Sequence, residues 1–135
     1  MALDGPLVDR PTRYTIQIGP DQHVDAEADP TTGRGHPNWR FLNHSCAPNT
    51  RIDGRSMIAT KRIRAGDEIT FDYETTEWDM AAPFPCACKA AACRGLIRGF
   101  RHLSAAQRQR LVGAAAHLVD MVVVAAPRRA NRRAR

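Results

Sequence analysis

The sequence has little of several residue types, and each shortage excludes a class of protein. Aromatic side chains make up 6% of the 135 residues, so any core must be small and built mainly from aliphatic side chains. The most apolar run, Leu118–Ala126, contains Asp120 and falls far short of the roughly 20 residues that a membrane-spanning helix requires. The residues that follow Met1 include no signal-peptide pattern. A cytoplasmic chain with no membrane partner is therefore expected.

Lysine is also scarce, and the positive charge is concentrated at one end. Two lysines accompany 18 arginines, a bias that together with the abundant alanine favours a bacterial source. Five arginines lie in residues 128–135, and removing their charges from the net +6 leaves +1 for the rest of the chain. We expect residues 127–135 to form a disordered, solvated basic tail, with weak nucleic-acid contact as the alternative.

Short alternating segments separated by turn residues predict a β-rich chain. Gly19-Pro20-Asp21 and Asp53-Gly54-Arg55 each separate two segments that are suited to a hairpin. Residues 29–38 are rich in Pro, Gly, Thr and Asn, which predicts a loop. The expected strands are Arg13–Ile18, His23–Ala26, Asn49–Ile52, Ser56–Ala59 and Ile69–Tyr73.

The pattern changes near the C-terminal end. Apolar residues recur at helical spacings from Leu103 to Val122, and Ser104 followed by Gln107 has the form of a capping box. These features predict one helix from about Ala105 to about Val123 within a C-terminal segment 101–126. The fold class is therefore expected to be mainly β, with an α+β arrangement.

All four cysteines are suited to a single metal ion. Three form the close-set pattern Cys-x-Cys-x4-Cys, and tetrahedral zinc needs four soft donors, so the fourth must come from elsewhere in the chain. A closed all-cysteine shell would be structural, because it leaves no open coordination position. The alternative is a set of unliganded thiols; disulfides are not expected in a reducing compartment. The predicted ligands are Cys46, Cys86, Cys88 and Cys93.

Three ordered motifs resemble one known family. Residues 40–49 read RFLNHSCAPN, residues 66–73 read GDEITFDY, and the cysteine cluster is followed by Arg94-Gly95. Together they resemble the two signatures and the post-SET module of SET-domain protein lysine methyltransferases. The resemblance runs from about Tyr14 to about Phe100. It implies a small SET-type β fold with a pseudoknot over residues 1–85, a post-SET zinc module over residues 86–100 and a protein substrate that bears a lysine.

The resemblance also implies roles for individual residues. Asn43 and His44 would contact S-adenosylmethionine, with Arg40 and Phe41 beside it, and Tyr73 would be the catalytic tyrosine. In this family the cysteine of the first signature completes the post-SET zinc site, and Cys46 holds that position in residues 40–49.

A narrow channel for the lysine side chain would be lined by Phe71, Tyr73 and Tyr14. In a strand, residues two apart share a face, so Phe71 and Tyr73 would line the channel while Asp72 points away. Phenylalanine at position 71 implies room for more than one methyl group. The neighbouring sulfonium and the apolar channel would favour the neutral amine, and bulk water would take its proton. The alternative for Phe71 and Tyr73 is an ordinary buried strand face.

A competing hypothesis comes from the start of the sequence. SET domains open with a glycine-rich strand and turn that cradles the cofactor, and no such element precedes Tyr14. The alternative function is therefore a catalytically impaired SET remnant that acts as a zinc-stabilised module for binding protein or nucleic acid.

Overall fold

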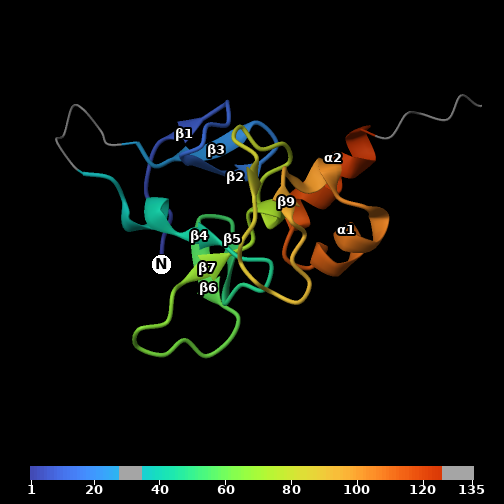
Figure 1. Cartoon of the computed structure of the whole chain (residues 1–135). Coiled ribbons are helices and arrows are strands. Elements are labelled where there is room, and N and C mark those ends of the chain that lie inside the picture. Colours follow the sequence, from blue (N-terminus) through green and yellow to red (C-terminus); the bar gives the residue numbers. More distant parts are fainter. Residues whose placement is uncertain (28–34, 126–135) are drawn as a thin grey trace, which may run out of the picture.

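The computed structural model describes residues 1–27 and 35–125, and within them it is built from short strands with two helices near the C-terminal end (Figure 1). This confirms a small α+β fold. The strands are β1 (Leu7–Val8), β2 (Thr15–Gly19), β3 (Gln22–Asp25), β4 (Asn43–His44), β5 (Thr50–Asp53), β6 (Ser56–Ala59), β7 (Thr70–Phe71), β8 (Phe84–Pro85) and β9 (Leu96–Ile97).

Both predicted hairpins are present. β2 pairs antiparallel with β3, and β1 adds to the other edge of β3, which gives a three-stranded sheet in the order β1-β3-β2. β5 pairs antiparallel with β6 across a turn in which Gly54 has a φ of 57°, a left-handed conformation that glycine adopts without steric cost. The chain start lies beside this hairpin, because Ala2 pairs with Ser56.

The segments that carry the two sequence signatures lie side by side. β4 and β7 pair in parallel, with Asn43 opposite Thr70 and His44 opposite Phe71. Parallel neighbours require a long connection, and here residues 45–69 supply it by forming the β5–β6 hairpin and a long exposed loop. This pairing brings together residues that are far apart in the sequence. The threading of a pseudoknot stays a prediction.

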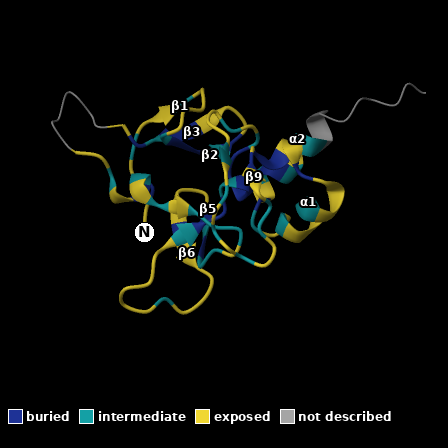
Figure 2. Ribbon diagram, viewed as in Figure 1, coloured by how far each residue is buried: buried dark blue, intermediate teal, exposed yellow. Residues whose placement is uncertain are grey.

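Two apolar clusters form the core (Figure 2). The larger one joins the β1-β3-β2 sheet to β5, β6, β7 and the short 3-10 helix η1 (Asn38–Phe41). Its buried members are Leu3, Ile16, Val24, Ala26, Trp39, Ile52, Met57 and Phe71. The smaller one lies beneath the C-terminal helices and consists of Phe100, Leu103, Ala115 and Leu118.

The prediction of a single C-terminal helix was wrong. The chain forms α1 (Ala105–Leu111) and α2 (Ala116–Ala125), with a turn between them that contains Gly113. Glycine has a low helix propensity, and the turn lets Ala115 and Leu118 pack in the same cluster as Phe100. The predicted capping box at Ser104 is confirmed. Residues 126–135, and with them the predicted basic tail, lie outside the described part, as do residues 29–34 of the predicted loop.

Within the described ranges, neither helix has the length and apolar character that crossing a membrane would require.

Candidate active site and cysteine cluster

The paired strands β4 and β7 bring His44 against Tyr73. Nδ1 of His44 accepts a hydrogen bond of 3.1 Å from the backbone N–H of Tyr73, and the two rings lie edge to face at 5.4 Å. The His44 side chain is 1% exposed, and burial, with the nearby Arg94 guanidinium, lowers its pKa to about 4. The imidazole is therefore neutral and fixes the backbone at Tyr73.

A narrow cleft lies beside Tyr73. Its internal volume of ≈ 60 Å³ is far below the ~300–1,000 Å³ of a pocket for a drug-sized ligand, so it suits one slim side chain. The rings of Phe71 and Tyr73 lie 4.8 Å apart in its wall. The residues that line it are Thr12, Arg13, Tyr14, Thr15, Ile16, Trp39, Arg40, Leu42, Phe71, Tyr73, Thr76, Glu77, Met80 and Ala81.

Two oxygen atoms of the cleft-lining residues Tyr73 and Leu42 are hydrogen-bonded to each other. The hydroxyl of Tyr73 donates a short hydrogen bond to the backbone carbonyl of Leu42, and both residues line the cleft. Burial, together with the Glu77 carboxylate, raises the pKa of Tyr73, so its hydroxyl stays protonated. The lining of the cleft thus combines aromatic rings with this hydroxyl–carbonyl pair.

The four cysteine sulfurs form a second centre. All four Sγ atoms lie within 4.8 Å of one another, and those of Cys46 and Cys86 are 4.0 Å apart. Around a tetrahedral zinc ion with Zn–S bonds of about 2.3 Å, sulfurs are about 3.8 Å apart, so the donor set and its spacing fit such an ion. Burial raises the pKa of the Cys46 thiol to about 12, and a bound dication would supply the charge that stabilises a thiolate there.

Backbone contacts hold the cysteine loop in place. β8 pairs antiparallel with β9, and the backbone N–H of Cys86 donates to the carbonyl of Gly95 at 2.7 Å. A turn follows in which Lys89 has a φ of 59°, and Cys93 donates to Ala90 across it at 3.0 Å. These contacts place the loop ends next to each other and beside Cys46.

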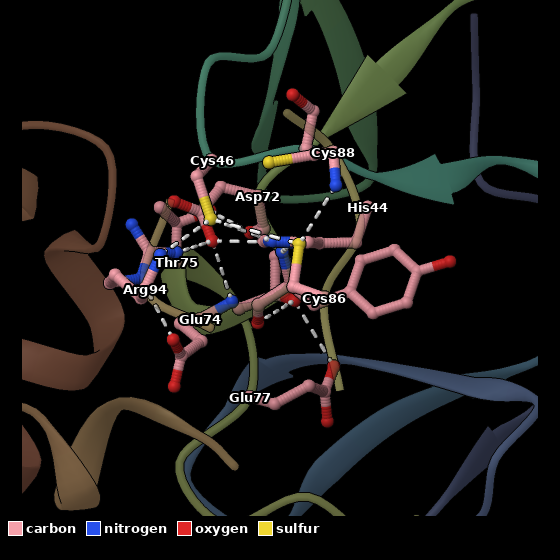
Figure 3. A network of polar contacts seen from close by, with 12 residues as sticks. His44, Cys46, Asp72, Glu74, Thr75, Glu77, Cys86, Cys88 and Arg94 are labelled. Carbon is pink, nitrogen blue, oxygen red and sulfur yellow. Dashed lines mark hydrogen bonds and ion pairs between the residues drawn. The ribbon is translucent and has the colours of Figure 1, made fainter. Parts of the chain in front are cut away.

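Arg94 connects the cysteine cluster to the segment of Tyr73 (Figure 3). Its Nη2 donates to Asp72 at 2.5 Å and its Nε donates to Glu74 at 2.9 Å, while its backbone N–H points at the sulfur of Cys46 at 3.5 Å. The Asp72 and Glu74 side chains are 2% and 1% exposed. Burial raises the pKa of Asp72, and the Arg94 guanidinium opposes that rise. The guanidinium therefore compensates two buried carboxylates.

Comparison with known families agrees with this geometry. The family model described as "SET domain" matches residues 9–74, which include β2 to β7 and Tyr73. This stretch of the chain is therefore similar to a SET domain.

Curated proteins are similar to the same region and extend beyond it. Methyltransferase flvH of Aspergillus flavus is 34% identical over 103 residues, which cover 73% of this chain and 53% of that protein. The H3 lysine-4 specific histone-lysine N-methyltransferase of Schizosaccharomyces pombe is 39% identical over 62% of this chain and 9% of its own. Histone-lysine N-methyltransferase ASHH3 of Arabidopsis thaliana is 36% identical over 60% of this chain and 22% of its own. The chain thus spans about half of the first of these relatives and far less of the others.

The residues expected to surround the cofactor lie on two sides of one segment, residues 40–44. Arg40 lines the cleft, and its guanidinium carbon lies 3.9 Å from the centre of the Tyr14 ring. Phe41 is 67% exposed, and the exposed Asn43 donates to Glu68 at 2.7 Å. The side chain of His44 is buried against Tyr73 instead. The segment therefore presents Phe41 and Asn43 to solvent and Arg40 to the cleft.

The predicted strand Ile69–Tyr73 is shorter than expected. β7 ends at Phe71, and Tyr73 begins the 3-10 helix η2 (Tyr73–Thr75), because the Asp72 carboxylate accepts from the backbone N–H of Glu74 and caps it. The rings of Phe71 and Tyr73 still lie together, and Asp72 points away from the cleft as expected, but into a buried network. Phe71 and Tyr73 therefore lie together as predicted, but not because they share a face of one strand.

The sequence analysis missed the ion-pair network. A signal was present: Asp72 and Glu74 flank Tyr73 in a segment predicted to be buried, and buried carboxylates need a partner. The partner, Arg94, directly follows the last cysteine, and the fold of the cysteine loop places it beside both carboxylates. Nothing in the sequence selected Arg94 over the other arginines.

Replacing Arg94 by alanine is expected to lower the free energy of unfolding by about 3–5 kcal/mol, because it leaves two buried carboxylates unpaired. The matched control is Arg101→Ala, since Arg101 pairs with Asp79 at 3.2 Å and both side chains are half exposed. That control should cost less than about 1 kcal/mol. Denaturant unfolding of both variants measures the difference, and equal costs would show that the buried network contributes no more than a surface pair.

Proposed function

We propose that this chain is a SET domain that transfers a methyl group from S-adenosylmethionine to the amine of a lysine side chain in a protein. The observation that carries the proposal is the narrow cleft whose lining includes aromatic rings and the hydrogen-bonded pair of Tyr73 hydroxyl and Leu42 carbonyl. A lysine has an unbranched four-carbon stem and a terminal amine, which match aromatic walls and polar oxygen atoms. The named activities of the relatives support the same reaction class.

The segment around Leu42 would separate the two substrates. Leu42 lines the cleft, whereas its neighbours Phe41 and Asn43 are exposed on the outside. An exposed aromatic ring beside a side-chain amide is suited to a nucleoside, which offers a flat base and polar edges. We therefore infer that the methyl donor binds on this outer side, where it supplies an electrophilic methyl carbon on a sulfonium. The amine would approach that carbon through the cleft.

The residues of the cleft would contribute mainly by positioning. The Phe71 and Tyr73 rings hold the lysine stem in line and keep water away, which replaces a bimolecular encounter by a fixed geometry. The Tyr73 hydroxyl and the Leu42 carbonyl oxygen present negative partial charge where positive charge develops on the transferring methyl group. Phe71 places no hydroxyl in the cleft, which supports the proposal that more than one methyl group can be added.

We propose that the cysteine cluster binds one structural zinc ion and forms a post-SET module. Four cysteine thiolates fill a tetrahedral shell and leave no position for a substrate, so the ion would take no part in methyl transfer. It would hold residues 86–93 against Cys46 and thereby keep Arg94 between Asp72 and Glu74. This gives the module a physical link to the backbone at Tyr73.

The source and setting of the protein remain proposals that rest on composition. The arginine and alanine bias supports a bacterial source, and the sequence supports a cytoplasmic location. The names of two relatives place methylation on histone H3 or on histone lysine in those proteins, so lysine-bearing basic tails are the first substrates to test.

Nucleic-acid contact is proposed only for the arginine-rich end. The impaired binding module is not favoured, because the relatives are methyltransferases.

Isothermal titration of the zinc-loaded protein with S-adenosylmethionine tests the donor site. Asn43→Ala is expected to weaken binding by about tenfold, the effect of losing roughly 1.4 kcal/mol of hydrogen bonding. Asn38→Ala is the matched control, because Asn38 is an exposed asparagine of η1 that does not line the cleft. Saturable binding that Asn43→Ala weakens and Asn38→Ala does not would support a donor site on the outer side, where Phe41 and Asn43 are exposed. A folded, zinc-loaded protein that binds no donor would contradict the proposed function.

A further inference from the structure

Glu77 is a buried carboxylate in the wall of the cleft, and no motif pointed to it. It follows η2, and its backbone N–H donates to the carbonyl of Tyr73 at 2.9 Å. The residue is 7% exposed, and it lines the same cleft as Phe71, Tyr73 and Tyr14. Its position is fixed by the same turn that fixes Tyr73.

One oxygen of this carboxylate has a structural task. Oε1 of Glu77 accepts from the backbone N–H of Gln17 at 2.8 Å and from the Thr76 hydroxyl at 3.1 Å. The Gln17 side chain in turn accepts from the backbone N–H of Trp78 at 2.9 Å, so the two residues hold β2 against the segment after η2. Among residues 1–27 and 35–125, no hydrogen-bond donor reaches Oε2 of Glu77.

The structural task does not require a charge. A neutral amide would accept the same two hydrogen bonds through its own oxygen, without the cost of burying a carboxylate. The arginines that line the cleft are engaged elsewhere: the guanidinium carbons of Arg13 and Arg40 lie 5.3 and 3.9 Å from the centre of the Tyr14 ring. A buried carboxylate of a cleft-lining residue, with one oxygen that no donor among the described residues reaches, is typical of a functional group.

The pKa values of the titratable groups around the cleft agree with a functional role for Glu77. Burial raises the pKa of Glu77 to about 7, and hydrogen bonds from Gln17 and Thr76 oppose the rise. His117 of α2 faces the same turn through a contact of 2.8 Å with the Thr76 carbonyl, and burial lowers its pKa, so it is neutral at pH 7. The Tyr73 hydroxyl is neutral too. Glu77 can therefore exchange a proton near neutral pH.

We propose that Glu77 binds the ammonium group of the substrate lysine in the cleft and accepts its proton before methyl transfer. The inference rests on the proposed function. In it, Glu77 takes the place of bulk water as the first proton acceptor. It also gives the cleft a preference for a cationic side chain over a neutral one of the same shape.

An N–H bond of the lysine ammonium breaks, the proton bonds to Oε2 of Glu77, and the nitrogen keeps the electron pair. That pair then forms the bond to the methyl carbon of the sulfonium donor, while the carbon–sulfur bond breaks and its electrons remain on sulfur. The proton on Glu77 leaves to solvent through the mouth of the cleft, which restores the carboxylate.

The first test compares the pH dependence of single-turnover methylation in the wild-type protein and Glu77→Gln. The glutamine keeps both hydrogen bonds of Oε1, so donor binding should not change. The wild-type rate is expected to rise through pH 7, as Glu77 ionises, and then to level off. The variant should be about 10²-fold slower at pH 7 and approach the wild type towards pH 10, where the free lysine loses its own proton. Asp53→Asn, an exposed carboxylate of β5, is the control.

A loss in Glu77→Gln that is the same at every pH would overturn the proposal and leave a structural role. A raised KM with unchanged kcat would overturn proton acceptance and leave ammonium binding alone. Wild-type protein that is inactive on every lysine peptide would instead contradict the proposed function. In that case NMR titration with butylammonium at pH 8 still decides the matter: shifts at the cleft residues that disappear in Glu77→Gln support the proposal, and equal responses overturn it.

Discussion

Replacing Tyr73 by phenylalanine is expected to lower the rate of methyl transfer about 10³-fold while donor affinity stays within a few-fold of the wild type. The change removes one oxygen atom from the lining of the cleft and leaves the ring against Phe71 and His44. The transition state then loses a negative partial charge beside the transferring carbon, whereas Phe41 and Asn43 on the outer side are untouched. Single-turnover rates with saturating donor, together with calorimetric affinities, separate the two effects.

Tyr14→Phe is the matched control for this prediction. Tyr14 lines the same cleft, but its contribution in the structure is the ring on which the Arg13 and Arg40 guanidinium groups lie. Its hydroxyl should therefore matter little to the rate. Equal losses in both variants would show that the cleft responds to any lost hydroxyl, and full activity in Tyr73→Phe would remove Tyr73 from the chemistry.

Removing the metal from the cysteine cluster is expected to lower the melting temperature by roughly 10 °C or more. Binding energy at structural zinc sites appears directly as folding energy, and a loss of several kcal/mol corresponds to such a shift in a domain of this size. The physical reason here includes Arg94, whose position beside Cys46 depends on the loop that the metal would hold. Cys86→Ser removes one ligand and should reproduce the effect of chelation.

Ala87→Ser is the control for the cysteine variant, because Ala87 is the exposed neighbour of Cys86 in the same loop. It should keep one zinc ion per chain and the wild-type melting temperature. Metal content by elemental analysis and thermal unfolding report the two quantities. A purified protein that binds no zinc, or a Cys86→Ser variant that melts with the wild type, would contradict a structural metal.

The sequence predicted those features that local patterns and residue counts determine. Turn residues at Gly19-Pro20-Asp21 and Asp53-Gly54-Arg55 located both hairpins. The shortage of cysteine made Cys46 the only partner for the close-set trio, and the structure brings their sulfurs together. Each signature segment is contiguous in the chain, so the sequence could predict that His44 and Tyr73 belong to one site, and the pairing of β4 with β7 brings the two residues together.

The remaining features depend on contacts that no local pattern encodes. Arg94 is one of 18 arginines in the sequence. It compensates Asp72 and Glu74 because the fold of the cysteine loop places it beside them. Glu77 becomes part of the cleft because the turn at η2 and the backbone of Gln17 fix it there. The periodic apolar pattern that suggested one helix is equally compatible with two helices around Gly113, and burial of Ala115 decides between them.

The most direct test of the central claim is a methyl-transfer assay with labelled S-adenosylmethionine, the zinc-loaded protein and a library of lysine-containing peptides, read by mass spectrometry. We expect label on the side-chain nitrogen of lysine, absent when that lysine is replaced by alanine and strongly reduced with Tyr73→Phe. A folded protein that binds the donor yet labels no lysine, or labels peptides equally well with Tyr73→Phe, would contradict the account.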